Sequence, residues 1–132
     1  MIIGTMTPAR RGWTFSLNVC SLSQSGLSAG LHAFSAAFYD LLFRTSSETL
    51  LEVARNPLRL GAEIGFFSVL HTWSQKLAIH PHVHCVVPAG GLSLDHTRWV
   101  RSQKNYFLPK EVLQEVFRGK FHEALKQAFH DV

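Results

Sequence analysis

One segment of the 132-residue sequence constrains the fold more than any other, the run His-Pro-His-Val-His-Cys-Val-Val from His80 to Val87. Successive side chains of a β-strand point to opposite faces of a sheet. In a strand, three imidazoles would therefore share one face and three apolar side chains the other: His80, His82 and His84 against Val83, Cys85 and Val87. The alternation predicts a strand from Pro81 to Val87 with one apolar face and one histidine face.

The segments on either side of this strand predict an α+β fold. Apolar spacing indicates a helix from Phe34 to Ala54, which Asn56-Pro57 ends because the residue before proline leaves the α region. Aromatic and β-branched residues indicate a strand from Ile64 to Trp73. The turn at residues 88–91 precedes a third strand at Thr97–Arg101, and an amphipathic helix follows Pro109. We expect an antiparallel meander with helices packed on the sheet.

Residues 1–34 have a different pattern from the rest of the chain. A strand-like stretch from Trp13 to Val19 precedes a run of serines and glycines at residues 21–30. We therefore predict a divergent, poorly ordered N-terminal segment at 1–34, and a single modest domain at 35–132.

Composition excludes several classes of protein. Arg44, Glu48 and Glu52 interrupt the most hydrophobic stretch, so no apolar run reaches the ~18 residues of a membrane span. The N-terminus has no secretory signal pattern, which predicts a cytoplasmic protein with no membrane partner. The two cysteines, Cys20 and Cys85, are too few for a four-thiolate zinc site and are expected to stay free thiols.

The histidine face has the chemistry of a metal site. Same-face neighbours on a strand lie ~6.6 Å apart along the chain, so two imidazoles can tilt inward and share one divalent cation. His82 and His84 are the predicted ligands, with His71 and His80 as further candidates. A site with so few protein ligands leaves coordination positions open, as in catalysis. His71 could instead hold the tautomer of another imidazole, and the whole cluster could be a polar sheet face.

A basic stretch without acidic residues follows the histidine segment. Guanidinium and ammonium groups next to flat rings suit single-stranded nucleic acid, whose phosphates need cations and whose bases stack on aromatics. The predicted contacts are Arg98, Arg101, Lys104, Tyr106 and Lys110, with Trp99 and Phe107 among them. The alternative is a solvated loop whose aromatics turn into the core.

Several blocks of the sequence, taken in order, resemble one family of DNA transposases. His82-Val83-His84 has the histidine–hydrophobic–histidine form of the HUH endonucleases, which act on single-stranded DNA. From about residue 35 to the end, the surroundings are similar to rolling-circle transposases of the insertion sequence ninety-one type. The blocks include Tyr39-Asp40-Leu41-Leu42-Phe43-Arg44, Leu60-Gly61-Ala62-Glu63-Ile64-Gly65, Leu70-His71-Thr72-Trp73, Gly90-Gly91-Leu92-Ser93 and Phe107-Leu108-Pro109.

The resemblance implies a sheet of HUH or ferredoxin-like type, here incomplete, and a role in DNA transposition and recombination. In that family His82 and His84 would hold Mg²⁺ or Mn²⁺, which polarises a scissile phosphate in single-stranded DNA at transposon ends. A tyrosine on a downstream helix then attacks, giving a 5′-phosphotyrosine.

The predicted nucleophile is missing from the sequence. The family's catalytic tyrosines lie well beyond the metal motif, Tyr39 belongs to the first helix, and Tyr106 lies in a loop and is kept only as a substitute. We therefore expect a truncated, inactive transposase fragment that binds metal and single-stranded DNA. The alternatives are a non-catalytic module that binds single-stranded nucleic acid and, less favoured on length, a metal-dependent hydrolase of small molecules.

Overall fold

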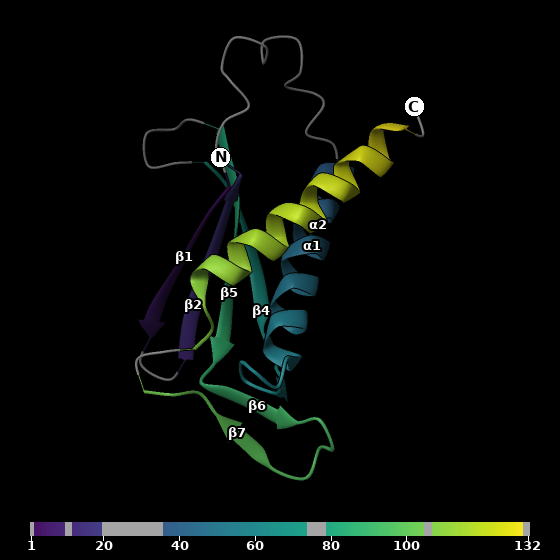
Figure 1. Cartoon of the computed structure of the whole chain (residues 1–132). Coiled ribbons are helices and arrows are strands. Elements are labelled where there is room, and N and C mark those ends of the chain that lie inside the picture. The colour runs from purple at the N-terminus through teal and green to yellow at the C-terminus, as the bar shows by residue number, and fades with distance from the viewer. Residues whose placement is uncertain (1, 10–11, 20–35, 74–78, 105–106, 131–132) are drawn as a thin grey trace.

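The fold is a four-stranded antiparallel sheet with two helices on one face and a smaller sheet at one end (Figure 1). The computed structural model describes residues 2–9, 12–19, 36–73, 79–104 and 107–130. In chain order the elements are β1 Ile2–Ala9, β2 Gly12–Val19, α1 Ala36–Arg55, β3 Ala62–Glu63, β4 Phe67–Trp73, β5 Ile79–Pro88, β6 Gly90–Ser93, β7 Trp99–Arg101 and α2 Lys110–His130.

Strand β5 occupies an inner position of the larger sheet, whose strand order is β1-β2-β5-β4. It pairs antiparallel with β2 on one side and with β4 on the other. The strand predicted from the histidine alternation is therefore confirmed, as is the α+β class.

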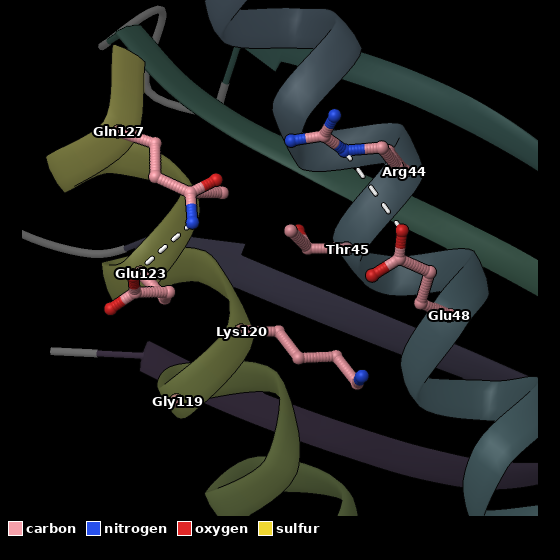
Figure 2. Close-up of a pocket in the computed structure, with 8 residues that line it drawn as sticks. Arg44, Thr45, Glu48, Gly119, Lys120, Glu123 and Gln127 are labelled. Atoms are coloured by element: carbon pink, nitrogen blue, oxygen red, sulfur yellow. Dashed lines mark hydrogen bonds and ion pairs between the residues drawn. The ribbon is translucent and has the colours of Figure 1, made fainter. Parts of the chain in front are cut away.

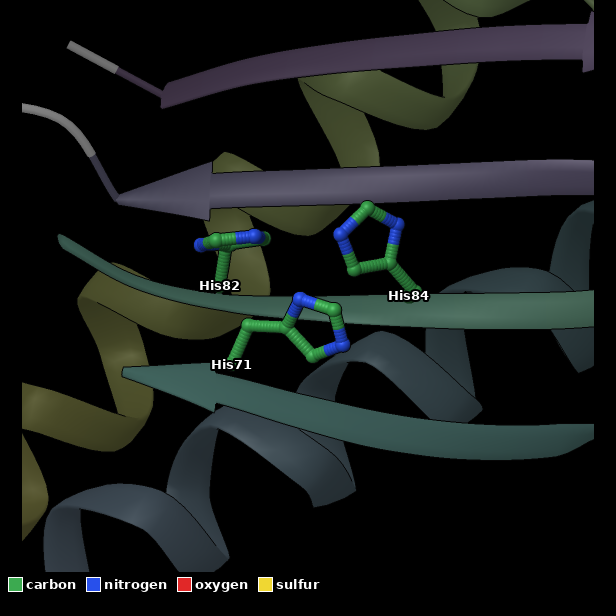
Figure 3. A group of neighbouring side chains, drawn as sticks. All are labelled: His71, His82 and His84. Carbon is green, nitrogen blue, oxygen red and sulfur yellow. The ribbon is translucent and has the colours of Figure 1, made fainter. Parts of the chain in front are cut away.

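The apolar face of the larger sheet packs against both helices. Phe15 on β2 and Val83, Cys85 and Val87 on β5 are fully buried. They meet buried side chains of α1 and α2, namely Leu42, Leu50, Leu113, Phe117 and Phe121. Because α1 and α2 lie on the same side of the sheet, they leave its other face uncovered by helix (Figures 1 and 3).

Helix α1 buries hydroxyl groups in its contact face without leaving them unsatisfied. Thr45 and Thr49 each donate from Oγ1 to the carbonyl four residues earlier, at 2.7 Å in both cases. Ser46 does the same toward Leu42 O at 2.6 Å. A buried hydroxyl costs free energy unless it is hydrogen-bonded, and these bonds remove that cost. The helix ends at Arg55, one residue before the predicted Asn56-Pro57 stop.

An ion pair links the two helices on their outer side. Lys120 Nζ on α2 lies 2.7 Å from Glu52 Oε2 on α1. The Glu52 side chain is 58% exposed, so water screens the pair and its contribution to stability is small.

The structure corrects the predicted meander. Of the strand expected at Ile64–Trp73, the part Phe67–Trp73 forms β4, and β3 at Ala62–Glu63 lies just before the expected strand. Strand β6 begins inside the stretch expected to be a turn, and the predicted third strand is β7, which pairs with β6 instead of β5. Together β3, β6 and β7 make a separate three-stranded sheet. Strand β6 was not predicted, because Gly90-Gly91 has no side-chain alternation that would indicate a strand.

Strands β1 and β2 place part of the N-terminal segment in the larger sheet. The strand predicted at Trp13–Val19 is β2, and Trp13 and Phe15 belong to the core. The serine-glycine run lies outside the described residues, and the boundary at residue 34 stays a prediction. Among the described residues, neither helix is long and apolar enough to cross a membrane.

Candidate metal centre

Three histidines meet on the sheet face that the helices leave uncovered. His71 on β4 pairs directly with His82 on β5, and His84 pairs with Val69, two residues before His71. Directly paired residues of antiparallel strands project from the same face. His71, His82 and His84, which we call the histidine triad, therefore lie together although one comes from a different strand. Figure 3 shows the three imidazoles in front of the strands and the helices behind.

The rings of the histidine triad are close enough to act together. The ring centroids of His71 and His84 are 4.5 Å apart, those of His82 and His84 are 4.8 Å apart, and those of His71 and His82 are 5.2 Å apart. One ring nitrogen from each residue lies within 4.8 Å of the others. His71, predicted only as a candidate ligand, is thus brought to His82 and His84 by strand register.

This spacing fits three imidazoles that share one cation. Nitrogens bound at ~2.1 Å in tetrahedral or octahedral geometry lie ~3.0–3.4 Å from one another. The triad nitrogens fall within 4.8 Å, so small tilts of the rings would close the remaining gap. Three protein ligands leave at least one position for water or substrate, as in catalytic sites.

The environment of His84 favours the form that binds metal. Burial lowers the pKa of His84 from its ordinary value, and the neighbouring imidazoles of His71 and His82 lower it further. A lower pKa keeps the ring neutral near pH 7, and a neutral ring nitrogen is the metal ligand. His82 is only 9% exposed, whereas His71 lies at the exposed margin of the cluster.

Other candidate ligands are accounted for elsewhere in the structure. Cys85 lies on the core face of β5, where burial raises the pKa of its thiol above the ordinary value. The expectation that it turns away from His82 and His84 is confirmed. Glu63 Oε2 is 2.9 Å from His96 Nε2 in the smaller sheet. His80 belongs to β5, but its side chain lies outside the described part of the chain.

The triad face also carries residues that the sequence did not single out. Ser16 on β2 is paired with His84 from the side opposite β4 and is 8% exposed. Phe67 and Val69 on β4 share the face and are 61% and 43% exposed. Alternation in Trp13–Val19 was the signal that could have placed Ser16 on this face. Its position next to His84 depends on strand pairing, which the sequence does not encode locally.

The structure places most of the residues predicted to contact DNA, and the two aromatics among them, at different depths. Arg98, Arg101, Lys104 and Lys110 are all exposed, whereas Tyr106 lies outside the described residues. Of the aromatics among them, Phe107 is 3% exposed and stacks on Trp13 with ring centroids 6.3 Å apart. Trp99 is 50% exposed. Phe107 thus turns into the core, as in the alternative of a solvated loop, whereas Trp99 does not.

A groove between the two helices is a poorer candidate for chemistry. Figure 2 shows that it is lined by side chains of both signs, including Arg44, Glu48, Lys120 and Glu123. Arg44 faces Glu48 at 4.0 Å and Gln127 donates to Glu123 at 3.2 Å. Its charges are matched locally, and it lies on the helix side of the sheet, away from the triad.

The antiparallel sheet with both helices on one face agrees with the HUH type of fold expected from the sequence. Two solved structures of the conjugative relaxase TrwC in complex with oriT DNA have this fold. The metal-free one matches with a TM-score of 0.67 and 14% identity, covering 92% of this chain and 46% of that one. The metal-bound one has a TM-score of 0.63 and 14% identity, covering 92% and 45%.

Sequence comparison gives the family. The model of the family described as Putative transposase (Y2_Tnp) matches residues 65–132, more than half of the chain, and the chain belongs to this family. Putative transposase y4qJ of Sinorhizobium fredii (strain NBRC 101917 / NGR234) is 55% identical over 94 residues, covering 71% of this chain and 24% of that protein. The transposase for insertion sequence element IS801 of Pseudomonas savastanoi pv. phaseolicola is 40% identical over 75 residues, covering 57% and 16%. The match thus spans a quarter or less of either relative.

Proposed function

We propose that this chain supplies the metal-binding part of a site that cleaves single-stranded DNA at transposon ends. The observation that carries the proposal is the convergence of three imidazoles from two strands on the helix-free face of the sheet. Family membership supports the reaction class, since transposases break and join DNA strands.

The donor set bears on the choice of ion. His71, His82 and His84 would hold a divalent cation, which when bound polarises the phosphate oxygens of the strand to be cut. Mg²⁺ prefers oxygen ligands, whereas imidazole suits transition metals. Of the two ions predicted from the sequence, Mn²⁺ therefore fits the triad better than Mg²⁺.

Three features of the chain would support the binding of a cation and of DNA at this site. Strand pairing fixes the backbone of His71 opposite that of His82, so that both rings project from the same face of the sheet. Near neutral pH, the lowered pKa of His84 means that few protons have to be displaced from this residue when a cation binds. Exposed cations at Arg98, Arg101, Lys104 and Lys110 would hold phosphates of the bound strand.

Calorimetric titration with MnCl₂ and with ZnCl₂ tests the metal proposal. We expect one ion per chain, with binding reduced at least tenfold in His82→Ala and His84→Ala and less in His71→Ala. His122→Ala is the matched control, because His122 is an exposed residue of α2. Unchanged affinity in both His82→Ala and His84→Ala would eliminate the site.

We further propose that the chain binds the strand without completing its cleavage. Tyr39 lies on α1, on the opposite side of the sheet from the triad, and packs edge-on against Phe38 with centroids 5.9 Å apart. Incubation with a single-stranded transposon-end oligonucleotide and Mn²⁺ should yield no covalent adduct. An adduct that Tyr106→Phe abolishes would contradict this proposal and assign the attack to Tyr106.

The second candidate function is a non-catalytic module that binds single-stranded nucleic acid. The exposure of Arg98, Arg101, Lys104 and Lys110 favours it, because these cations are available to phosphates without any metal. Salt-sensitive binding that survives both chelation and His82→Ala would support this alternative against the metal-dependent site.

A further inference from the structure

The smaller sheet presents an exposed tryptophan on a structured support. Trp99 opens β7 and pairs with Leu92 on β6, and the two side chains are 50% and 44% exposed. A ring exposed to this extent is accessible to a flat partner, and covering it would bury a large apolar area. In Figure 1, β6 and β7 extend beyond the lower end of the larger sheet, where neither helix covers them.

Gly90 makes room for the indole ring. A Cβ added to Gly90 would lie 2.7 Å from Nε1 and 3.0 Å from Cε2 of Trp99, closer than real Cβ atoms approach other atoms. The indole therefore lies directly over a position that only glycine can occupy without displacing it. The ring is supported from below by backbone and remains half open to solvent.

The turn that joins β6 to β7 is ordered by one carboxylate. Asp95 Oδ1 accepts hydrogen bonds from Ser93 Oγ at 2.5 Å, from Thr97 Oγ1 at 2.8 Å and from Thr97 N at 3.1 Å. These bonds lower the pKa of Asp95 to about 2. The hairpin is thus held in one conformation before any ligand arrives, which lowers the entropy cost of binding.

The charges around Trp99 suit a polyanion that carries flat rings. Arg101 lies two residues from Trp99 on the same face of β7, and Arg98 and Lys104 are exposed nearby in the chain. Glu63 shares the face through its pairing with Leu92, and its carboxylate is bonded to His96 at 2.9 Å. The carboxylate of Glu63 is therefore paired with His96, which reduces its repulsion of a polyanion.

We infer that Trp99, supported by Gly90, is a base-stacking platform for the single-stranded DNA that the histidine triad acts on. This inference rests on the proposed function. It adds a contact to the rings of the bases, beside the contacts that the basic side chains make to phosphates. Aromatic stacking accepts any base, so the platform holds the strand without selecting its sequence. Arg101 binds the adjoining phosphate.

The platform and the triad are joined by continuous chain. Gly90 follows His84 by six residues, which span at most ~20 Å at the rise of a strand. A stacked strand advances ~3.4 Å per nucleotide, so about six nucleotides cover that distance. An oligonucleotide of six or more nucleotides is therefore long enough to reach both places.

Fluorescence anisotropy of the full chain with oligo-dT of 3 and 12 nucleotides tests the inference. We expect Trp99→Ala to weaken binding of the 12-mer about 5- to 150-fold, the range for loss of one base–aromatic stack. Trp99→Phe should restore part of the affinity, since a smaller ring still stacks. Leu58→Ala is the control, because Leu58 is 87% exposed in the turn after α1 and distant in sequence from β7.

A second measurement changes the ligand. A 12-residue oligomer with the same phosphates but without bases should bind the unaltered chain weakly and should not distinguish it from Trp99→Ala. Equal affinity of Trp99→Ala and unaltered protein for oligo-dT, with metal binding intact, would overturn the platform and leave the proposed function standing. Absence of oligo-dT binding by the unaltered protein would overturn both.

Discussion

The two faces of β5 differ in what they do, although their residues alternate along one strand. Val83, Cys85 and Val87 are fully buried against the helices, while His82 and His84 meet His71 on the other face. The core face is held by apolar contact, which is insensitive to the identity of the ion or substrate present. On the histidine face, strand register places the three imidazoles side by side, and these rings add little to the packing of the core. The comparison teaches that one face of the sheet supplies the core, while the other leaves three imidazoles grouped and outside the core.

The largest effect should come from the same substitution made on each face. Phe15→Ala removes a fully buried ring from the core face of β2, and we expect it to cost about 3–5 kcal/mol of unfolding free energy. Phe67→Ala removes a ring that is 61% exposed on the histidine face and should cost less than about 1 kcal/mol. Urea unfolding followed by circular dichroism measures both. Similar losses would show that the two faces are equally packed and would break the comparison.

The next effect concerns metal-linked stability. A ligand that binds only the folded state stabilises it by about 2.7 kcal/mol at a concentration 100 times its Kd. We expect Mn²⁺ to raise the unfolding free energy of the unaltered chain by this order at such a concentration, and to leave His84→Ala unchanged. Val87→Ala, on the core face, should lower stability but keep the full increment from the ion. An equal Mn²⁺ increment in His84→Ala would remove the histidine face from metal binding.

The sequence predicted the faces of β5 because alternation is a local property. His82 and His84 follow from it directly, and the positions of both helices follow from apolar spacing. His71 could be named only as a candidate, because its place depends on how β4 pairs with β5. The register is set across a connection of several residues, and one residue of slip would turn every side chain of β4 to the other face.

Other features lay beyond local reasoning for related physical reasons. Strand β1 and the pairing of β6 with β7 were not predicted, because β1 contains Gly4 and Pro8 and β6 begins with two glycines, which leaves little periodic signal. The exposed ring of Trp99 and the buried ring of Phe107 lie eight residues apart in the same basic stretch. Only the tertiary structure, in which Phe107 meets Trp13, separates them.

A smaller effect should come from the ion pair on the helix side. Replacing Lys120 by Met removes the partner of Glu52, and we expect a loss of about 0.2–1 kcal/mol because the pair is solvent-screened. The loss should shrink at 1 M NaCl, where the Debye length is ~3 Å. Metal affinity should not change, since the pair lies across the sheet from the triad. A double-mutant cycle with Glu52→Gln isolates the pair from the packing of the lysine stem, and a salt-independent coupling would contradict this account.

The smallest effect should be a change in amide exchange that is confined to the hairpin of β6 and β7 in the smaller sheet. The folded-state pKa of Asp95 is about 2, below its ordinary value of 3.8, because Ser93 and Thr97 donate to the charged carboxylate. A depressed carboxyl pKa gives stability that is fully present above the unfolded value and is lost as pH falls through the folded one. We expect Asp95→Asn to increase amide exchange in β6 and β7 at pH 6, and the difference from the unaltered chain to narrow between about pH 4 and pH 2. Exchange in β5 should be the same in both proteins at every pH, because Asp95 contacts neither face of that strand. A difference that extends to β5 would mean that the smaller sheet contributes to holding the histidine triad, and the division of roles between regions would have to be redrawn.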